Sequence, residues 1–578
     1  MRFFFSFKKI AVNLGLVILS AFFFAGSFPN PVIEKGLPLL AWIAYVPVFI
    51  LIRRSSLPES VCWGGLYGYA AYGLFNYWLG AFHPLAGMIV GLIYFVFLAA
   101  VFFFLKLADI FFPRRGYIVQ WVIWISYEYL RTLGFLGYSY GITGYSQWTL
   151  LPVIQIADLF GVWGVSALVV FPSVFIAAVL VNGRFAAGTI RKCIMKEKIP
   201  ALLWTAALIL TLVYGAVSPV DYSSAPAARL ALIQLNADPW KAEVPGMEME
   251  QYRENLSVLR RLSDEALREE PRPDLVVWSE TAFVPRIYWH TTYRDDHESW
   301  VLVRELLRYL TRQDVPFLLG NDDARKDPVK NPEKDHRVDY NAVMLYTGGE
   351  VSGIYRKLRL VPFTEYFPYK KQLPWLYNTL AKADTHFWEK GSDETIFSVP
   401  FRNGGGNFKF SSPICFEDTF GYLSRNFVRG GSELIVNLSN DAWSKSLSAQ
   451  NQHLSMAVFR AVENRRSMAR STASGQTCGI DPNGKILAMA APFTESWITV
   501  ELPVVTPDTL YTAWGDFLPL FFLAAAFLLL ISGLLLRIVK LNGVHGKGRK
   551  TADAGAQARD AVSVDGARRR KQKDFSAG

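Results

Sequence analysis

Cysteine is scarce in this sequence, with four cysteines in 578 residues. Cys62, Cys193, Cys415 and Cys478 are too few for a disulfide framework in a chain of this length. No CxxC pair or Cys/His spacing typical of a zinc site occurs, and the seven histidines are scattered. The sequence also has no internal repeat and no glycine-rich phosphate loop. We therefore predict neither a structural metal nor a cofactor.

The chain lacks a basic globular region, although its formal net charge is +11. The positive charge lies in residues 1–220 and 537–578, whereas residues 221–536 carry 34 basic against 39 acidic side chains. A nucleic acid partner would need a basic groove in the globular part. The sequence therefore does not support nucleic acid as a partner.

Apolar sequence is abundant, at 51% of all residues, and much of it lies in long runs. A membrane-spanning helix needs roughly 20 mostly apolar residues. The sequence predicts about eight spans, at Ile10–Phe28, Leu37–Ile52, Ser60–Phe82, Ala86–Phe112, Tyr117–Leu133, Phe160–Val181, Ile199–Val220 and Phe517–Val539. The second run is short, so it is expected to be tilted or partly re-entrant. The first run has an alternative interpretation as a signal peptide.

Loop charges predict the orientation, because Lys and Arg are retained on the cytoplasmic side of a membrane. Alternate loops of residues 1–220 hold nearly all the basic residues, and the loops between them hold Lys35, with Arg131 near a helix end. Both chain ends are therefore predicted to be cytoplasmic, with residues 221–515 outside. The last residues, rich in Arg and Lys, are predicted to form a disordered cytoplasmic tail.

One outer loop, from Gly134 to Asp158, has no Lys or Arg and is rich in aromatic residues. Such a loop suits the headgroup boundary of a membrane, and a simple connector is the alternative.

The central region alternates short β-rich runs with helical stretches. The predicted strands are Leu230–Leu235, Leu275–Trp278, Phe317–Gly320, Ala342–Tyr346, Phe408–Ile414 and Leu434–Leu438, and the predicted helices are Met249–Leu267, Ser299–Thr311 and Gln450–Arg466. The predicted fold class is a multi-pass α-helical membrane bundle plus an α/β extracytoplasmic domain layered helix–sheet–sheet–helix. We place the membrane domain at 1–220, the outer domain at 221–510, a last transmembrane helix at 511–540 and the tail at 541–578.

Three segments of the outer domain each place an ionisable side chain at or after a buried-looking strand. They are Asp274-Leu-Val-Val-Trp-Ser-Glu280-Thr, Tyr355-Arg-Lys357-Leu-Arg-Leu-Val-Pro-Phe-Thr-Glu365-Tyr and Ser412-Pro-Ile-Cys415-Phe-Glu417-Asp. A thiol with a pKa of about 8.5 is a poor nucleophile unless a nearby cation or base favours the thiolate. Lys357 and Glu280 supply those two functions, which makes Cys415 the candidate nucleophile.

In this order the motifs resemble those of the nitrilase superfamily, and Asn437-Leu-Ser-Asn-Asp-Ala-Trp443 strengthens the match. Because apolar spans surround the motifs, the chain is most similar to the membrane-bound apolipoprotein N-acyltransferase family. The resemblance implies a nitrilase-like αββα sandwich on the periplasmic side of a bacterial inner membrane.

The same resemblance implies a role for each candidate residue. It makes Glu280 the general base, Lys357 the stabiliser of the oxyanion and Cys415 the sulfur that carries the acyl group as a thioester. Matching by position, the supporting and pocket residues are Glu365, Glu417, Asn341, Trp443 and Phe416. Alternatives remain open for three of these: Glu417 as the partner of a neighbouring base, Asn341 as a strand cap and Trp443 as a core residue.

The chain departs from the family pattern at three places. Thr364 stands where glycine is common, Phe416 where tyrosine is frequent, and Ser444-Lys445 where Phe-Gly is usual. These departures affect the expected contacts with the acyl chain but not the trio Glu280, Lys357 and Cys415.

The implied reaction transfers a fatty acyl chain from a membrane phospholipid to the N-terminal amine of a diacylglyceryl-cysteine on an apolipoprotein, in two steps. One alternative is a membrane-tethered amidase that uses water as the acceptor, and another is a lipid-binding scaffold with a disused site. A Cys415–Cys478 disulfide would abolish the mechanism. The segments Ile287–Tyr293 and Leu373–Leu380 are interpreted either as interfacial arms or lids or as ordinary core helices.

Overall fold

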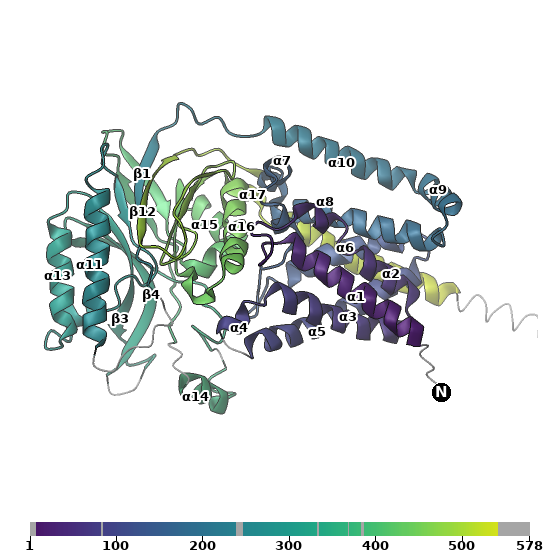
Figure 1. Ribbon diagram of the computed structural model, residues 1–578, viewed down its shortest axis with the longest axis horizontal. Coiled ribbons are helices and arrows are strands. Elements are labelled where there is room, and N and C mark those ends of the chain that lie inside the picture. Colours follow the sequence, from purple (N-terminus) through teal and green to yellow (C-terminus); the bar gives the residue numbers. More distant parts are fainter. Residues whose placement is uncertain are drawn as a thin grey trace, which may run out of the picture.

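The computed structural model describes residues 7–82, 85–237, 247–331, 335–367, 369–382 and 387–540. A helical bundle and a two-sheet domain lie next to each other along the long axis of the molecule (Figure 1). The predicted cytoplasmic tail lies outside the described residues.

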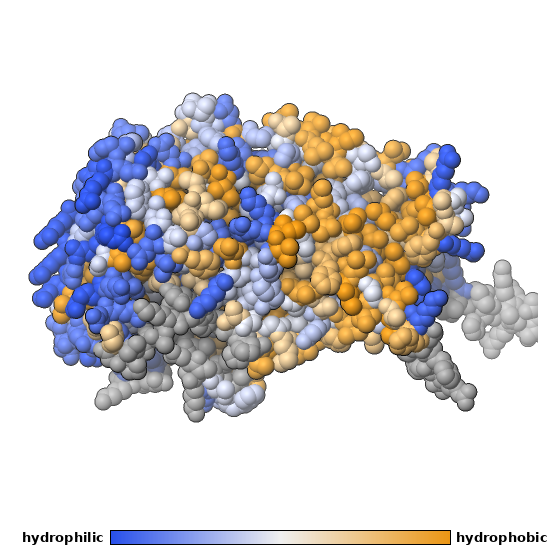
Figure 2. Space-filling model, viewed as in Figure 1, coloured by the Kyte–Doolittle hydropathy of each residue, from blue (hydrophilic) through white to orange (hydrophobic). Residues whose placement is uncertain are grey.

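The bundle is built from the N-terminal helices and one C-terminal helix. Its elements are α1 (Phe7–Ser27), η1 (Pro38–Trp42), α2 (Val46–Arg54), α3 (Leu57–Phe75), α4 (Leu79–Phe82), α5 (Ala86–Phe111), α6 (Gly116–Leu130), η2 (Thr143–Gln147), α7 (Leu151–Ile154), α8 (Ala157–Asn182), α9 (Ala187–Lys196), α10 (Lys198–Val217) and the helix Phe517–Lys540. Within the described ranges, five of these helices are long and apolar enough to cross a membrane: α1, α5, α8, α10 and Phe517–Lys540. Apolar side chains cover the surface of the bundle, in contrast to the mostly polar outer end of the two-sheet domain (Figure 2).

The other three predicted spans are shorter or interrupted. The run Leu37–Ile52 forms η1 and then α2, and a proline stands near the start of each helix. The run Ser60–Phe82 divides into α3 and α4. Helix α6 has 15 residues, and a helix of that length is only about 22 Å long, less than the hydrocarbon thickness.

Helix α8 lies at the centre of the bundle. In its most apolar window 72% of the residues are buried, against 11% for α10, which runs along the edge of the molecule (Figure 1). Gly161 bends α8 with a φ of 62°, and a Cβ there would meet the ring of Tyr511 at 2.7 Å. The glycine therefore allows a bent helix to approach the chain that leads into the last span.

The two-sheet domain contains two six-stranded mixed sheets packed face to face. The strands are β1 (Ala227–Gln234), β2 (Leu275–Val277), β3 (Phe317–Lys326), β4 (Arg337–Thr347), β5 (Glu350–Arg356), β6 (Ile396–Pro400), β7 (Asn407–Ser411), β8 (Leu434–Ser439), β9 (Ser467–Thr472), β10 (Cys478–Ile480), β11 (Ile486–Met489) and β12 (Ser496–Pro503). One sheet has the order β12-β1-β2-β3-β4-β5 and the other β11-β10-β9-β8-β7-β6. Ser471 on β9 donates its hydroxyl to Ile233 O and Val277 O, which joins the two sheets at their centre.

Helices cover both outer faces of this sandwich. Helices α11 (Glu248–Ala266) and α13 (Ser299–Thr311) pack on the first sheet, and α15 (Gly421–Arg429) and α16 (Leu447–Asn464) belong to the second. The result is the predicted helix–sheet–sheet–helix order. Helix α16 also packs against α8, so it lies between the second sheet and the bundle.

Buried ion pairs fix this junction between sandwich and bundle. Arg465, just after α16, pairs with Asp158 at the start of α8 at 2.6 Å. Glu463 accepts the backbone N–H of Val162 at 3.1 Å and pairs with Arg460 at 2.8 Å. The sandwich is thus held against the bundle helices by largely buried charged groups.

Candidate active site

Glu280 follows β2, in a turn that passes close to β3. A Cβ on Gly320 would lie 2.5 Å from the Thr281 nitrogen, so the glycine lets the turn approach the strand. The Glu280 carboxylate accepts hydrogen bonds from Asn341 Nδ2 at 2.8 Å and from the Asn440 backbone N–H at 3.0 Å. These donors come from both sheets and hold the carboxylate in one orientation.

Lys357 follows β5 and is completely buried. Its Nζ donates to Glu365 Oε1 at 2.7 Å and lies 3.3 Å from Glu280 Oε1. Burial lowers the pKa of a lysine, but the charges of Glu280 and Glu365 outweigh this effect, so the Lys357 pKa is raised well above its usual value. The side chain is therefore a fixed ammonium group between two carboxylates.

Cys415 stands at a sharp turn between the end of β7 and the short helix η3 (Cys415–Thr419). Its φ is 51°, an uncommon left-handed conformation for a residue with a side chain. Ile414 bridges to Leu438 of the β8 strand, and Asn437 Nδ2 donates to Cys415 O at 3.2 Å. The sheet and this amide hold the strained turn, which directs the thiol out of the strand.

The charge around the sulfur favours the neutral thiol. Burial raises the pKa of Cys415 well above its ordinary value, and Glu280 and Asp441 raise it further, against the opposing charge of Lys357. This differs from the expectation that Lys357 and Glu280 favour the thiolate, because burial and two carboxylates outweigh one ammonium. Attack by this sulfur therefore needs a base that removes its proton, and Glu280 interacts electrostatically with the thiol.

Glu417 and Glu365 accept hydrogen bonds from backbone N–H groups of the loops that carry Lys357 and Cys415. Glu417 accepts the N–H groups of Leu358, Arg359 and Ile414 and the hydroxyl of Tyr355, at 2.7 to 2.8 Å. It thus joins the chain after Lys357 to the chain before Cys415, rather than pairing with a neighbouring base. Glu365 Oε2 accepts the Val361 N–H at 2.9 Å, which closes the loop that carries Lys357.

The predicted pocket residues lie around the trio in different ways. Asn341 on β4 contacts Glu280 directly. Phe416 is 8% exposed and packs edge-on against Phe420 at 4.9 Å. Trp443 packs edge-on against Trp78 of the bundle at 5.3 Å, so it links the two parts of the molecule.

The aromatic loop Gly134–Asp158 packs against the sandwich. Tyr140 is buried and interacts electrostatically with Cys415. Phe135 contacts Phe363 with ring centroids 5.3 Å apart, and Arg359 donates to Gly134 O at 2.5 Å. The loop is therefore more than a connector, because it joins the bundle to the part of the sandwich that carries Cys415 and Arg359.

The two predicted arms differ. Ile287–Tyr293 forms α12 (Ile287–Thr292), which packs on β3 with Ile287 and Trp289 buried. Leu373–Leu380 falls in α14 (Pro374–Lys382), where Trp375 is 66% exposed and the helix stands apart from the sandwich (Figure 1). The segment Ile287–Tyr293 therefore fits the interpretation as a core helix, and Leu373–Leu380 fits the interpretation as an exposed arm.

The predicted alternative of a Cys415–Cys478 disulfide is wrong, because both cysteines are free. Cys478 lies on β10, where burial raises its pKa to about 12. It is therefore an inert core residue.

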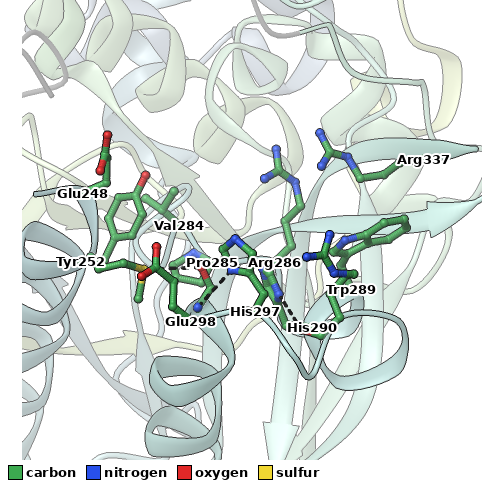
Figure 3. A pocket seen from close by; sticks show the side chains of 13 residues that line it. Glu248, Tyr252, Val284, Pro285, Arg286, Trp289, His290, His297, Glu298 and Arg337 are labelled. Atoms are coloured by element: carbon green, nitrogen blue, oxygen red, sulfur yellow. Dashed lines mark hydrogen bonds between the residues drawn. The ribbon is translucent and has the colours of Figure 1, made fainter. Parts of the chain in front are cut away.

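Two surface cavities lie outside the trio, because neither is lined by Glu280, Lys357 or Cys415. One of about 310 Å³ lies beyond the Glu280 turn, where side chains including Arg286, His290 and His297 line it (Figure 3). The other, of about 710 Å³, lies between bundle and sandwich and is lined by Glu34, Tyr77, Trp78 and the segment 444–448. The second cavity borders the Trp78–Trp443 contact.

Sequence reasoning missed several buried polar residues behind Cys415. His453, Arg470, Asp418 and Asp441 form one hydrogen-bonded group. The available signal was Arg470 within the strand Ser467–Thr472, because a charged residue in a strand buried along its whole length needs a partner.

Comparison with known proteins gives two family matches. Residues 229–508 match the carbon-nitrogen hydrolase family, and residues 20–175 match the apolipoprotein N-acyltransferase N-terminal domain. The chain is similar to apolipoprotein N-acyltransferase 1 of Treponema denticola, with 44% identity over 88% of this chain and 93% of that one. It is also 45% identical to apolipoprotein N-acyltransferase 1 of Treponema pallidum, over 90% of this chain and 95% of that one.

A more distant relative, the apolipoprotein N-acyltransferase of Borreliella burgdorferi, is 30% identical over 85% of this chain and 90% of that one. These matches span both the bundle and the sandwich, so they concern the whole architecture and not the hydrolase-like part alone. The chain belongs to the apolipoprotein N-acyltransferase family and is a membrane-bound acyltransferase with a nitrilase-like domain.

Proposed function

We propose that the protein transfers a fatty acyl chain from a membrane phospholipid to the α-amine of the diacylglyceryl-cysteine at the N-terminus of an apolipoprotein, through a thioester on Cys415. The observation that carries this proposal is the site at the junction of bundle and sandwich. There a fixed ammonium contacts two carboxylates and interacts with a thiol.

In the first step, Glu280 takes the thiol proton while the sulfur attacks the ester carbonyl of the phospholipid. The S–C bond forms, and the C–O bond to the lysophospholipid breaks. Glu280 returns the proton to the departing alkoxide. Lys357 stabilises the negative oxygen of the tetrahedral intermediate, because its raised pKa keeps it charged throughout.

In the second step, the neutral α-amine of the acceptor attacks the thioester carbonyl. The N–C bond forms, the S–C bond breaks, and Glu280 passes the amine proton to the sulfur. Glu365 keeps Lys357 in place during both steps, and Asn341 keeps Glu280 oriented. Both substrates are lipids, and a site against the bundle admits their headgroups while the acyl chains stay in hydrocarbon.

We further propose that the sandwich lies on the periplasmic side of the inner membrane, with both chain ends in the cytoplasm. The loop charges support this orientation. It is tested in a variant in which Cys62, Cys193 and Cys415 are replaced, by labelling intact spheroplasts with a membrane-impermeant maleimide. Asn403→Cys, on an exposed loop of the sandwich, should be labelled before lysis and Ala187→Cys only after it. The reverse pattern would reject the orientation.

The reaction is tested with purified protein, a phospholipid and a synthetic diacylglyceryl lipopeptide. Wild type should add one fatty acyl group to the lipopeptide amine, as read by mass spectrometry, and Cys415→Ala should add none. Free fatty acid without acylated amine would instead indicate the amidase-like alternative, in which water is the acceptor. Full turnover by Cys415→Ala would reject the mechanism.

A further inference from the structure

Four charged side chains behind Cys415 form a closed group that we call the ion ring: Asp418, Asp441, His453 and Arg470. His453 Nε2 lies 2.6 Å from Asp418 Oδ1, and its Nδ1 lies 2.9 Å from Asp441 Oδ1. Arg470 donates to the second oxygen of each aspartate, at 3.2 Å in the case of Asp441. All four side chains are at most 4% exposed, so water does not screen them.

The geometry determines the protonation of His453. Both ring nitrogens face carboxylate oxygens, which are acceptors only, so both nitrogens must donate. Arg470 Nη2 also lies 3.3 Å from Nδ1, but the contact with the Asp441 oxygen is the shorter one. Burial lowers the pKa of His453, yet the two aspartates raise it to about 9 overall. The ring therefore holds two cations and two anions, and its net charge is zero.

The ion ring joins the two loops that carry the proposed chemistry. Asp418 lies in η3, three residues after Cys415. Asp441 accepts the hydroxyl of Ser439 at 2.9 Å, and Ser439 also interacts with the Cys415 thiol. The neighbouring Asn440 donates its N–H to Glu280. The ring thus connects the turn of the nucleophile with the loop that orients the base.

We propose that His453 and Arg470 are positioning residues that cancel the charge of Asp418 and Asp441 beside the sulfur, so that the ionisation of Cys415 is controlled by Glu280 and Lys357. Without its two cations, the ring would place unbalanced negative charge next to a thiol that must lose a proton. If the ion ring served only as a scaffold, it would hold the loops in place, and the sign of its net charge would not change the ionisation of the Cys415 thiol.

The inference rests on the proposed nucleophile, and the test is the rate at which Cys415 reacts with N-ethylmaleimide at pH 7. Mass spectrometry of the peptide that contains Cys415 reads this rate without acyl transfer, and the rate follows the thiolate fraction. His453→Gln and Arg470→Gln, which each remove a cation, should slow the reaction by about three- to tenfold. Asp441→Asn, which removes an anion, should accelerate it by about twofold or more.

The double variant His453→Gln/Asp441→Asn removes one charge of each sign and serves as the matched control. Its rate should return to within about twofold of wild type, because the ring is again neutral. A scaffold role predicts instead that all variants change the rate in one direction and that the double variant is the most affected. That result, or unchanged rates in all the variants, would overturn the inference.

Variants that do not fold are recognised by size-exclusion chromatography and thermal unfolding in detergent. If one of the three single variants fails to fold, the remaining two, compared with wild type, still test the sign of the effect. The inference and the proposed function can be rejected separately. Full acyl transfer by Cys415→Ala would show that Cys415 is not the nucleophile, and would reject the proposed function. If acyl transfer requires Cys415 but the maleimide rates of the ring variants equal that of wild type, only the proposed role of the ion ring is rejected.

Discussion

Two clusters of buried charge lie beside Cys415, and they differ in charge balance. On one side, Lys357 alone stands against Glu280 and Glu365. On the other side, the ion ring sets two cations against two aspartates. The ring has as many cations as anions, whereas the cluster around Lys357 has one carboxylate more than it has cations. The comparison teaches that charge imbalance, rather than burial alone, distinguishes the reactive side of the site.

The largest effect is expected from removing the single cation of the unbalanced cluster. Lys357→Met should lower the rate of thioester formation by about a hundred- to a thousandfold, because the oxyanion loses its charged donor. The measurement is single-turnover acylation of the protein by phospholipid. A rate within tenfold of wild type would contradict the role of Lys357.

Breaking the balanced cluster should act mainly on stability. Arg470→Met leaves two buried aspartates with one cation and should cost about 3–5 kcal/mol of unfolding free energy. Arg402→Met is the matched control, because its ion pair with Asp314 is partly exposed and should be worth at most about 1 kcal/mol. Denaturant titration in detergent compares the two, and equal losses would show that burial of the ring carries little energy.

The ion ring also predicts a dependence of stability on pH. The pKa of His453 is raised to about 9 in the folded protein, above the ordinary value of about 6.5 in an unfolded chain. The folded state therefore binds the proton more tightly, so this contribution is complete below the unfolded value and is lost as pH rises through about 9. Wild type should lose more stability than His453→Gln between about pH 6.5 and pH 9. Parallel curves for the two proteins would show that His453 is not charged.

The smallest effect concerns the contact between bundle and sandwich at the mouth of the site. Trp78→Ala removes the ring that packs on Trp443 and should raise KM for the lipopeptide by about two- to tenfold with little change in kcat. Trp514→Ala, at an exposed tryptophan, is the control. A fall in kcat with unchanged KM would place the effect of Trp78 in the chemistry instead of substrate binding.

The sequence located Glu280 and Cys415 because each comes at the end of a predicted apolar strand, whereas Lys357 follows β5, a mostly exposed strand that the pattern did not predict. Glu280 comes after Leu275–Val277, and the predicted helix Ser299–Thr311 has the same bounds in the structure. That Glu280, Lys357 and Cys415 lie in one site could be inferred only from the order of the motifs and from the family resemblance. The catalytic roles of Glu280, Lys357 and Cys415 remain predictions, and the variants at Lys357 and Cys415 test two of them.

Burial between two layers hid the rest from the sequence. Helix α16 was predicted as Gln450–Arg466, but it is buried on nearly all sides because it lies between the second sheet and α8, so the sequence did not show which of its polar residues belong to the site. Strand β9, which carries Arg470, was not predicted, because it is buried along its whole length and its sequence shows no alternation of apolar and polar residues. The divided span at Leu37–Ile52 was predicted as one run because hydropathy does not register the breaks near Pro38 and Pro47.

The most direct test of the central claim is the intact mass of the purified protein after incubation with phospholipid alone. Wild type should gain the mass of one fatty acyl group, which hydroxylamine removes and which maps to the peptide containing Cys415. Cys415→Ser should gain no hydroxylamine-labile group. An acyl group that maps to another residue, or full lipopeptide acylation without any acyl-protein, would contradict the thioester route.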